Sequence, residues 1–326
     1  MSVNSPFLEA ELFSVAPMVD VTNSAFRRVA RVFTKRAMLY TEMIAAEALC
    51  HGKTNLIKHA GNELPCVLQL GGSDPRRLAL AAKIGEDFGY SCINLNAGCP
   101  SDKVQQGRFG AVLMKDPDLI GQCVSAMMNA VSIPVSVKTR IGVDEFDNED
   151  FTRYLIGTIF GYGCRHVIIH ARKCWLEGLS PKENRTVPPL DYDRVYNLKN
   201  DFPDLNITIN GGITDLCQCV IHLNHVEGVM LGRAVIDNPY LLAGVDHELF
   251  GDDAPVKSRE QCFYELLDLA ETFLSEGHKL QHLAIHVLNL FAGCPGARNY
   301  RRYLSEHMTQ EHAGVEVLEK AYAAMQ

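Results

Sequence analysis

The feature that most constrains the fold is a series of short apolar runs, each followed by polar turn residues and a longer stretch of helical spacing. The eight runs are Phe13–Met18, Met38–Met43, Cys66–Leu70, Cys92–Leu95, Pro134–Val137, His166–Ile169, Ile207–Ile209 and Val229–Leu231. Several are apolar throughout, as is typical of parallel strands buried on both faces. Eight alternating units predict an α/β chain folded as a (β/α)8 TIM barrel. A doubly wound sheet is the alternative, but the chain lacks the glycine fingerprint that such folds carry after their first strand.

The stretches between the apolar runs are expected to be helices. Pro75–Phe88 and Pro117–Val131 carry apolar residues at helical spacing, and proline suits a first helical turn. The alternation ends near Tyr240, and the remaining sequence has helical periodicity with almost no strand signal. We therefore predict a catalytic barrel over residues 1–242, followed by a small C-terminal all-helical domain over residues 243–326.

Composition and charge exclude several classes of protein. The chain is 47% hydrophobic and 21% charged, which is ordinary for a globular protein. No segment approaches the ~18 uninterrupted apolar residues of a membrane helix, and Met1–Leu12 lacks the features of a signal peptide. The 11 cysteines form no disulfide or zinc framework, so we expect reduced thiols, no metal site and a cytoplasmic location. A net charge of -8 argues against wholesale coating of nucleic acid but leaves room for a local basic groove.

Polar and glycine residues gather where the predicted strands end. The carboxyl ends of TIM-barrel strands meet at one mouth, where active sites lie. The residues at these ends include Pro17 and Met18, Gln69, Asn94 and Asn96, Lys138 and Arg140, His170 and Arg172, Asn210-Gly211-Gly212, and Gly232-Arg233. A barrel without a ligand has no reason to place so many of them together, so we predict a binding site at this mouth.

Two glycine turns follow the last two predicted strands. Asn210-Gly211-Gly212 and Gly232-Arg233 lie where TIM barrels commonly bind phosphate. Glycine lets backbone N–H groups approach a ligand closely, and Arg233 adds a charged donor. We interpret these turns as a phosphate site, with ordinary turn glycines as the alternative.

Three further side chains at the mouth have two interpretations each. Lys138, at the end of a buried strand, needs an anion or a polar ring, or else a salt bridge with a carboxylate such as Glu42. Gln69 can read an imide edge or bond adjacent backbone, and His170 can contact a ligand or remain a core histidine. The ligand interpretations together describe a planar, redox-capable molecule that carries phosphate, and flavin mononucleotide (FMN) fits that description.

One cysteine is held between two residues that shape the backbone. The motif Asn94-Leu95-Asn96-Ala97-Gly98-Cys99-Pro100 follows a predicted strand. Gly98 permits a sharp turn, and Pro100 fixes φ just after the thiol. The Cys99 thiol can therefore serve as an acid or a nucleophile, with a buried turn thiol as the alternative.

Taken together, these motifs resemble those of the tRNA-dihydrouridine synthases, most closely the DusA type, over almost the whole chain. The matching stretches are Ala16-Pro17-Met18, Gln69-Leu70-Gly71-Gly72, the Cys99 motif, Val137–Arg140, His170-Ala171-Arg172, Asn210–Ile213, Gly232-Arg233 and the long segment His170–Tyr192. The chain departs from the pattern near Val21, where the resemblance leads us to expect an aromatic residue.

The resemblance implies NADPH-dependent reduction of uridine to 5,6-dihydrouridine at positions 20 and 20a of the tRNA D-loop. Reduced FMN would deliver hydride to C6 of the uracil, and Cys99 would supply the proton to C5. The resemblance places FMN contacts at Pro17, Met18, Gln69, Lys138, His170, Asn210, Gly211, Gly212, Gly232 and Arg233. It places contacts with tRNA at Asn96, Arg172, Lys173, Glu177, Arg298 and Arg301.

Local basic clusters stand out in this acidic chain. They are Arg27-Arg28, Arg31, Lys35-Arg36, Lys173, Lys182, Arg185 and Arg298–Arg302, and they can bind tRNA or form solvated helix faces. The segment Gly296–Tyr303 interleaves arginine with tyrosine, which suits phosphate contacts combined with base stacking. We expect tRNA as the partner, no membrane partner, and a monomer.

Two other functions remain open. An FMN barrel acting on a free pyrimidine, similar to dihydroorotate dehydrogenase, would not need the arginine–tyrosine segment in the tail. An RNA-binding protein without turnover would not need an acid at Cys99.

Overall fold

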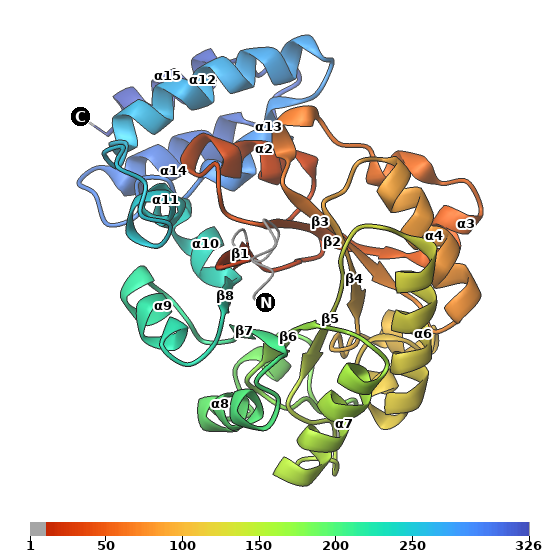
Figure 1. Cartoon of the computed structure of the whole chain (residues 1–326). Coiled ribbons are helices and arrows are strands. Elements are labelled where there is room, and N and C mark those ends of the chain that lie inside the picture. Colours follow the sequence, from red (N-terminus) through yellow and green to blue (C-terminus); the bar gives the residue numbers. More distant parts are fainter. Residues whose placement is uncertain (1–10, 326) are drawn as a thin grey trace.

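The computed structural model describes residues 11–325 and consists of a parallel barrel, helices around it, and a helical tail (Figure 1). Most of the segment Met1–Leu12, in which no signal peptide is expected, lies outside the described residues. The strands are β1 Phe13–Val15, β2 Leu39–Ala45, β3 Cys66–Gly71, β4 Cys92–Asn96, β5 Val135–Arg140, β6 His166–His170, β7 Asn206–Asn210 and β8 Gly228–Leu231. They pair in the order β1-β8-β7-β6-β5-β4-β3-β2. A parallel bridge between Ser14 and Met38 joins β1 to β2, so the predicted TIM barrel is confirmed.

The barrel helices begin at caps that the sequence provides. Pro75 and Pro117 open α4 and α6, and the side chains of Asp74 and Asp116 accept hydrogen bonds from the first turns. The helices are α2 Ser24–Phe33, α3 Ala46–Cys50, α4 Pro75–Asp87, α5 Asp102–Gln106, α6 Pro117–Ala130, α7 Glu149–Gly161, α8 Tyr192–Asp201, α9 Leu216–Leu223 and α10 Arg233–Asp237. Short 3-10 helices are η1 Thr54–Ile57, η2 Gly61–Glu63, η3 Gly110–Lys115, η4 Glu183–Arg185, η5 Pro239–Gly244 and η6 Ile285–Val287.

The two faces of the strands belong to different layers. Outward-facing residues such as Leu68 and Ile93 pack against the helices in the large apolar cluster. Val67 and Cys92 belong to a small cluster inside the barrel. Because strand side chains alternate, the inner face of a strand continues through every second residue. On β5 the inner residues are Ser136, Lys138 and Arg140. The two cations among them lie toward the carboxyl end of the strand, at the barrel mouth.

The long loop after β6 is organised around one buried side chain. Asn184 is fully buried, and its Oδ1 accepts from the backbone N–H of Trp175 at 2.8 Å. Its Nδ2 donates to the carbonyls of Trp175 at 2.9 Å and Leu179 at 3.1 Å. These bonds satisfy backbone groups of the loop that regular secondary structure would otherwise pair.

The tail is helical (Figure 1). Its helices are α11 Val245–Glu248, α12 Arg259–Ser275, α13 Leu280–Ala284, α14 Ala297–His307 and α15 Glu316–Ala323. Of these, α12 and α13 pack beside α2. The apolar cluster continues from the barrel into these helices, for instance from Val235 through Val245 to Phe263. The division between residues 242 and 243 therefore stays a prediction, because one core includes residues from both sides.

The basic residues of α2, and Arg36 just after it, bind protein groups, and this contradicts their interpretation as tRNA contacts. Arg27 is buried and pairs with Glu63 at 2.6 Å. Arg28 pairs with Glu276 of the tail at 2.6 Å, and Arg36 pairs with Asp252 at 2.7 Å. Arg31 donates to the carbonyl of Pro65 at 2.7 Å. In the sequence these arginines form a basic cluster, because the acidic residues that pair with them lie far away along the chain.

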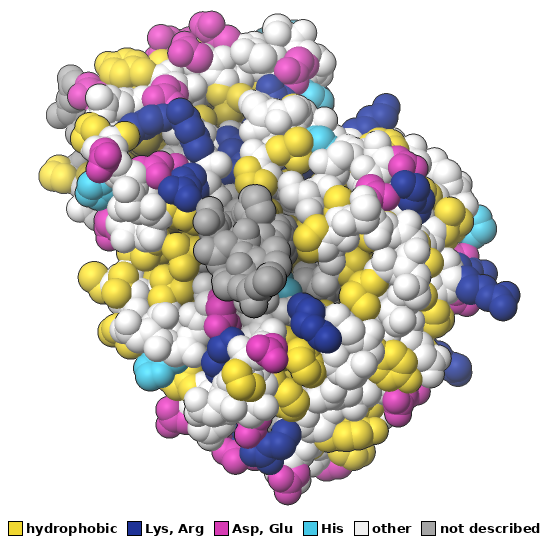
Figure 2. All heavy atoms as spheres, in the orientation of Figure 1, with side chains coloured by type: hydrophobic (Ala, Val, Ile, Leu, Met, Phe, Trp, Pro, Cys, Tyr) yellow, Lys and Arg dark blue, Asp and Glu magenta, His cyan; other side chains and the backbone are white. Residues whose placement is uncertain are grey.

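The charged side chains of both signs are interspersed on the face shown in Figure 2. No broad basic surface is visible on this face, as expected for a chain with a net charge of -8. Among the described residues, no helix combines the length and apolar character needed to cross a membrane.

Candidate active site

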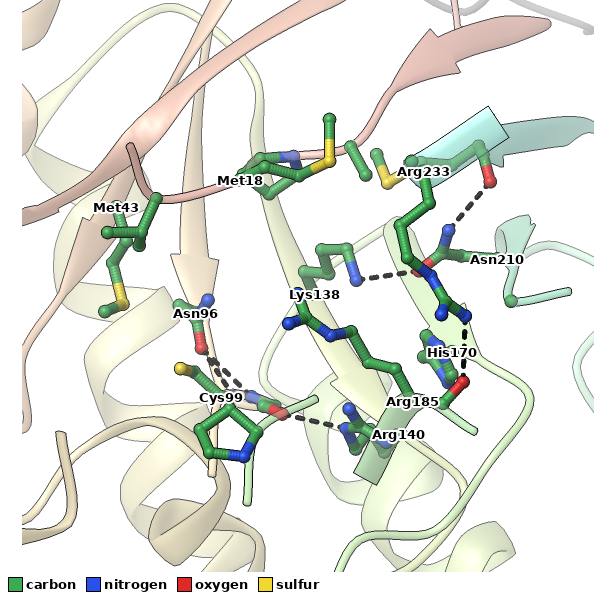
Figure 3. A pocket seen from close by; sticks show the side chains of 18 of the residues that line it. Met18, Met43, Asn96, Cys99, Lys138, Arg140, His170, Arg185, Asn210 and Arg233 are labelled. Atoms are coloured by element: carbon green, nitrogen blue, oxygen red, sulfur yellow. Dashed lines mark hydrogen bonds between the residues drawn. The ribbon is translucent and has the colours of Figure 1, made fainter. Parts of the chain in front are cut away.

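A cavity of about 920 Å³ opens at the carboxyl ends of the strands. This volume lies within the range of cofactor sites, which is about 300–1,000 Å³. Figure 3 shows basic side chains from several strands and loops around it. Residues on its wall include Pro17, Met18, Gln69, Asn96, Cys99, Lys138, His170, Asn210, Gly211, Gly212, Gly232 and Arg233. The structure thus brings every residue predicted to contact FMN into one cavity with Cys99 and Asn96.

The Cys99 turn is fixed by hydrogen bonds on both sides. Asn96 Oδ1 accepts from the backbone N–H groups of Gly98 at 3.1 Å and Cys99 at 3.0 Å. The Cys99 carbonyl accepts from the Ala111 N–H at 2.9 Å. Cys99 is partly exposed and lines the cavity, and its Sγ lies 3.5 Å from Ser101 Oγ. A partly exposed thiol on a fixed backbone can meet a ligand, which a fully buried turn thiol cannot.

Gly98 is required because its backbone lies close to a neighbouring strand, and it does not adopt a left-handed conformation. It is absent from the glycines with positive φ, so the predicted sharp turn does not depend on that conformation. A Cβ at Gly98 would lie 3.3 Å from the backbone of Thr139 on β5. The glycine therefore lets the Cys99 turn lie directly against the neighbouring strand.

Arg140 connects the Cys99 turn with the loop after β6. Its Nε donates to the Gly98 carbonyl at 2.9 Å. Its Nη1 donates to the carbonyls of Lys173 and Asn184, each at 3.1 Å. Burial lowers the pKa of Arg140, but the guanidinium keeps its charge because its ordinary pKa is very high. One buried cation thus holds together two segments of the cavity wall.

Lys138 has a polar partner in place of the carboxylate considered above. Its Nζ donates to Asn210 Oδ1 at 3.0 Å, while Glu42 accepts from the Asp20 N–H at 2.6 Å. Burial, with a contribution from the nearby Arg140, lowers the pKa of Lys138 to about 7. The ammonium therefore lacks a balancing charge within the described residues and suits an anionic ligand.

His170 lies on the other side of the view from Cys99 in Figure 3, and the Gly211-Gly212 turn lines the same cavity. Burial and the surrounding cations hold the pKa of His170 well below its usual range, so the ring is neutral. Its buried Nδ1 has no hydrogen-bond partner among the described residues. Gly211 and Gly212 have φ values of +113° and +75°, and a Cβ at Gly211 would lie 3.0 Å from the His170 ring. A polar ring without a partner, beside a turn that excludes side chains, is suited to bind a ligand.

The predicted tRNA residues outside the cavity lie in two regions. Arg172, Lys173 and Glu177 belong to the start of the loop after β6. The Arg172 guanidinium donates to the Pro188 carbonyl, and Lys173 pairs with Asp147 at 2.9 Å. The other two, Arg298 and Arg301, are exposed on α14 of the tail.

The cavity wall also includes residues outside the predicted FMN contacts, among them Met43, Ser101, Arg140 and Arg185. Arg140 could have been selected, because it follows Lys138 by two residues on the inner face of one strand. Arg185 lies in the irregular loop after β6, where no periodicity indicates which side chains reach the cavity. Within the described part of the chain, no cluster of three His, Cys, Asp or Glu side chains is arranged to hold a metal ion.

The fold and the cavity define a TIM-barrel protein with a cysteine and a group of basic side chains at one mouth. Comparison with known proteins places it within that class. The family model of dihydrouridine synthase (Dus) matches residues 14–326. The chain belongs to the dihydrouridine synthase family.

Several curated relatives are similar over nearly their whole length. A tRNA-dihydrouridine(20/20a) synthase of Shewanella oneidensis is 52% identical, covering 96% of this chain and 94% of its own. The protein of the same name from Vibrio cholerae is 50% identical, covering 95% of each chain. Another of that name, from Yersinia pestis, is 50% identical over 98% of this chain and 92% of its own.

One solved structure supports the fold alone. A 2-naphthoyl-CoA reductase in complex with 2-naphthoyl-CoA has a TM-score of 0.53 and 12% identity. The match covers 72% of this chain and 49% of that one, so this chain spans about half the length of that protein.

Proposed function

We propose that this chain reduces uridine to 5,6-dihydrouridine at positions 20 and 20a of the tRNA D-loop, with FMN as its cofactor and NADPH as reductant. Family membership and the names of the relatives support the reaction and the substrate. The observation that carries the proposal is the shared cavity of Cys99, Lys138 and the Gly211-Gly212 turn. A proton donor and an anion site lie together there, as a flavin-dependent reduction of a double bond requires.

The residues present fit FMN. The unpartnered His170 Nδ1, the uncompensated Lys138 and the open glycine turn are each suited to a cofactor that carries phosphate and a polar ring. Pro17, Met18, Gln69, Lys138, His170, Asn210, Gly211, Gly212, Gly232 and Arg233 would hold it. When bound, FMN would supply the hydride for C6 of the uracil.

The chain's own residues supply the other requirements of the reaction. The C5=C6 bond of uracil is a poor hydride acceptor, and positive charge in a buried site stabilises the negative charge that develops during addition. Lys138 and Arg140 provide such charge at the cavity wall. Cys99 holds the proton that C5 receives. The target base must leave its stack to enter the cavity, which costs a few kcal/mol.

Contacts with tRNA in this proposal come from both parts of the chain. Asn96 touches the target base in the cavity, and Arg172, Lys173 and Glu177 lie beside the mouth. The exposed Arg298 and Arg301 on α14 contact the phosphate backbone. We propose that the chain acts as a monomer in the cytoplasm.

Purified protein tests the proposal directly. It should be yellow, and it should oxidise NADPH in the presence of unmodified tRNA with formation of dihydrouridine. Turnover of free uracil, uridine or orotate without tRNA would favour the free-pyrimidine alternative. Colourless protein that added FMN does not change would exclude both flavoenzyme functions, and tRNA binding without turnover would favour the RNA-binding alternative.

We expect the protein to take up a proton at Lys138 when FMN binds. The Lys138 pKa of about 7 means that much of the apoprotein carries a neutral amine at pH 8. An anion in the same cavity favours the ammonium, so binding raises the pKa and draws a proton from solution. Affinity for FMN should therefore fall as the pH rises above 7. Calorimetry at pH 8 in two buffers of different ionisation enthalpy should show the uptake, and Lys138→Met should abolish it. Equal uptake by the variant would contradict the assignment.

We expect substitution of the tail arginines Arg298 and Arg301 to weaken tRNA binding without changing the rate of the chemical step. Arg298→Ala combined with Arg301→Ala should raise the KM for tRNA and leave kcat unchanged, because neither residue lines the cavity. The slope of log affinity against log salt should fall by about 1 for each lost phosphate contact. Arg76→Ala removes another exposed arginine from α4 and is the matched control. An unchanged KM in the double variant would remove α14 from the tRNA surface.

A further inference from the structure

A chain of side-chain hydrogen bonds runs beneath the floor of the cavity toward the Cys99 turn. Asn94 Nδ2 donates to Ser136 Oγ at 2.9 Å. Gln69 Nε2 donates to Asn94 Oδ1 at 2.8 Å, and Asn96 Nδ2 donates to Gln69 Oε1 at 2.9 Å. Asn96 Oδ1 then accepts from the backbone N–H of Cys99 at 3.0 Å. The four side chains, here called the amide relay, are those of Ser136, Asn94, Gln69 and Asn96.

Strand pairing brings the members of the amide relay together. Gln69 of β3 is the register partner of Asn94 on β4, and Asn94 is the partner of Ser136 on β5. Asn96 lies two residues further along β4, on the same inner face. Asn94 and Ser136 are both fully buried, and neither lines the cavity. Asn94 therefore has no access to a ligand, although Gln69 and Asn96 above it line the cavity wall.

The orientation of each amide in the relay is determined by the next one. The backbone N–H groups of Gly98 and Cys99 can only donate, so Asn96 must direct its Oδ1 toward them. Its NH2 group then faces Gln69, which must present its Oε1, and the Gln69 NH2 group then faces Asn94. Asn94 must accept through Oδ1 and donate to Ser136. Rotation of any one amide would bring two donors together.

We propose that Asn94 is a positioning residue for Cys99, acting through Gln69 and Asn96. Without an acceptor at residue 94, Gln69 Nε2 loses its hydrogen-bond partner, and the Gln69 amide is held only by its bond with Asn96. A Gln69 side chain that shifts no longer holds Asn96 Nδ2 in place. The Cys99 turn that is bonded to Asn96 Oδ1 then shifts as well, and the thiol loses its fixed position. This inference rests on the proposed function for its kinetic consequence, but its structural consequence can be measured without turnover.

Two substitutions separate this role from a general loss of packing. Asn94→Leu keeps the approximate size and removes both polar groups. Asn94→Asp keeps an oxygen that accepts from Gln69 Nε2 in either protonation state. Thr208→Val is the matched control, since it removes another buried hydroxyl from the barrel interior, one that bonds to His166 at 2.9 Å.

The first measurement is the alkylation of Cys99 by iodoacetamide in the flavin-free protein, followed by mass spectrometry of its peptide. The exposed Cys217 serves as the internal reference. Asn94→Leu should change the rate at Cys99 several-fold relative to Cys217, and Asn94→Asp and Thr208→Val should leave it near wild type. An unchanged rate in folded Asn94→Leu would overturn the proposal. If thermal unfolding shows that Asn94→Leu does not fold, Ser136→Ala is measured in its place, because it removes the acceptor of Asn94 Nδ2. It should change the rate at Cys99 several-fold relative to Cys217, and an unchanged rate would also overturn the proposal.

The second measurement is a double-mutant cycle on turnover. Asn94→Leu should lower kcat by about 10- to 100-fold, as expected for a misplaced catalytic group, with the KM for tRNA unchanged. In an Asn96→Ala background the same substitution should have little further effect, because the relay is already broken. An equal loss in both backgrounds would show that Asn94 does not act through Asn96 and would overturn the proposal. If wild-type protein forms no dihydrouridine, the proposed function fails, and the alkylation rates alone decide whether Asn94 positions the thiol.

Discussion

Replacing Cys99 with alanine is expected to slow the formation of dihydrouridine in tRNA by about 10²- to 10⁴-fold, the usual contribution of a positioned general acid. The thiol is the proton source for C5 in the proposed reaction, and alanine leaves none in its place. The Cys99 backbone is held by Asn96 and Ala111, and alanine can keep those bonds. The variant should therefore fold, bind FMN and bind tRNA as wild type does.

The measurement is a single-turnover rate with reduced enzyme and an unmodified tRNA transcript. Cys217→Ala is the control, because this cysteine is exposed on α9 and does not line the cavity. It should react at the wild-type rate. A Cys99→Ala protein that reacts as fast as this control would remove the thiol from the mechanism, and the proton would then have to come from another group or from water.

Replacing Glu63 with glutamine is expected to lower the free energy of unfolding by about 3–5 kcal/mol, because it leaves the buried Arg27 cation without its counter-charge. Glu63 is fully buried and lies 2.6 Å from the Arg27 guanidinium. It also accepts from Ser24 Oγ at 2.5 Å and from the Ala60 N–H at 2.7 Å. The substitution therefore disturbs a network that joins α2 to the loop before β3.

Urea unfolding followed by circular dichroism measures this loss. Lys83→Gln is the control, because Lys83 pairs with Glu86 on an exposed helix surface and such pairs are worth about 0–1 kcal/mol. Neither residue of the Arg27–Glu63 pair lines the cavity, so FMN binding by the folded variant should persist. A Glu63→Gln protein as stable as the Lys83→Gln control would mean that the pair contributes little to the fold.

The barrel could be predicted because two signals in the sequence locate its strands: the apolar runs themselves and the residues that begin the helices between them. Runs such as Cys66–Leu70 are apolar enough to be buried on both faces, and the helices between them begin at residues such as Pro75 and Pro117. The first run was the least accurate, since β1 ends at Val15 although the apolar residues continue to Met18. Pro17 and Met18 lie on the cavity wall, so their apolar character serves the mouth and not the strand.

The charged interactions could not be predicted, because their partners are distant in sequence. Arg28 and Glu276 are 248 residues apart, and only the packing of the tail on α2 brings them together. The sequence shows a basic cluster at this point, while the folded chain shows arginines neutralised by acids of other segments. Identification of a basic surface from sequence therefore fails where tertiary structure supplies the counter-charge.

The candidate site was largely predictable as a place, but its internal bonds were not. Rules for TIM barrels direct attention to strand ends, and Lys138, His170 and the Gly211-Gly212 turn lie there. The partners of Gln69 and Lys138 depend on strand register, which the sequence does not contain. The amide relay is the clearest case, because Asn94 reads in sequence as one more polar strand residue.

The most direct test of the proposed function is the mapping of dihydrouridine at single positions of tRNA from cells that lack their own (20/20a) synthase. Expression of this chain should restore dihydrouridine at positions 20 and 20a, and expression of Cys99→Ala at equal level should leave those positions as uridine. Uridine at both positions in cells that contain the folded wild-type chain, or dihydrouridine only at other positions, would contradict the proposed function.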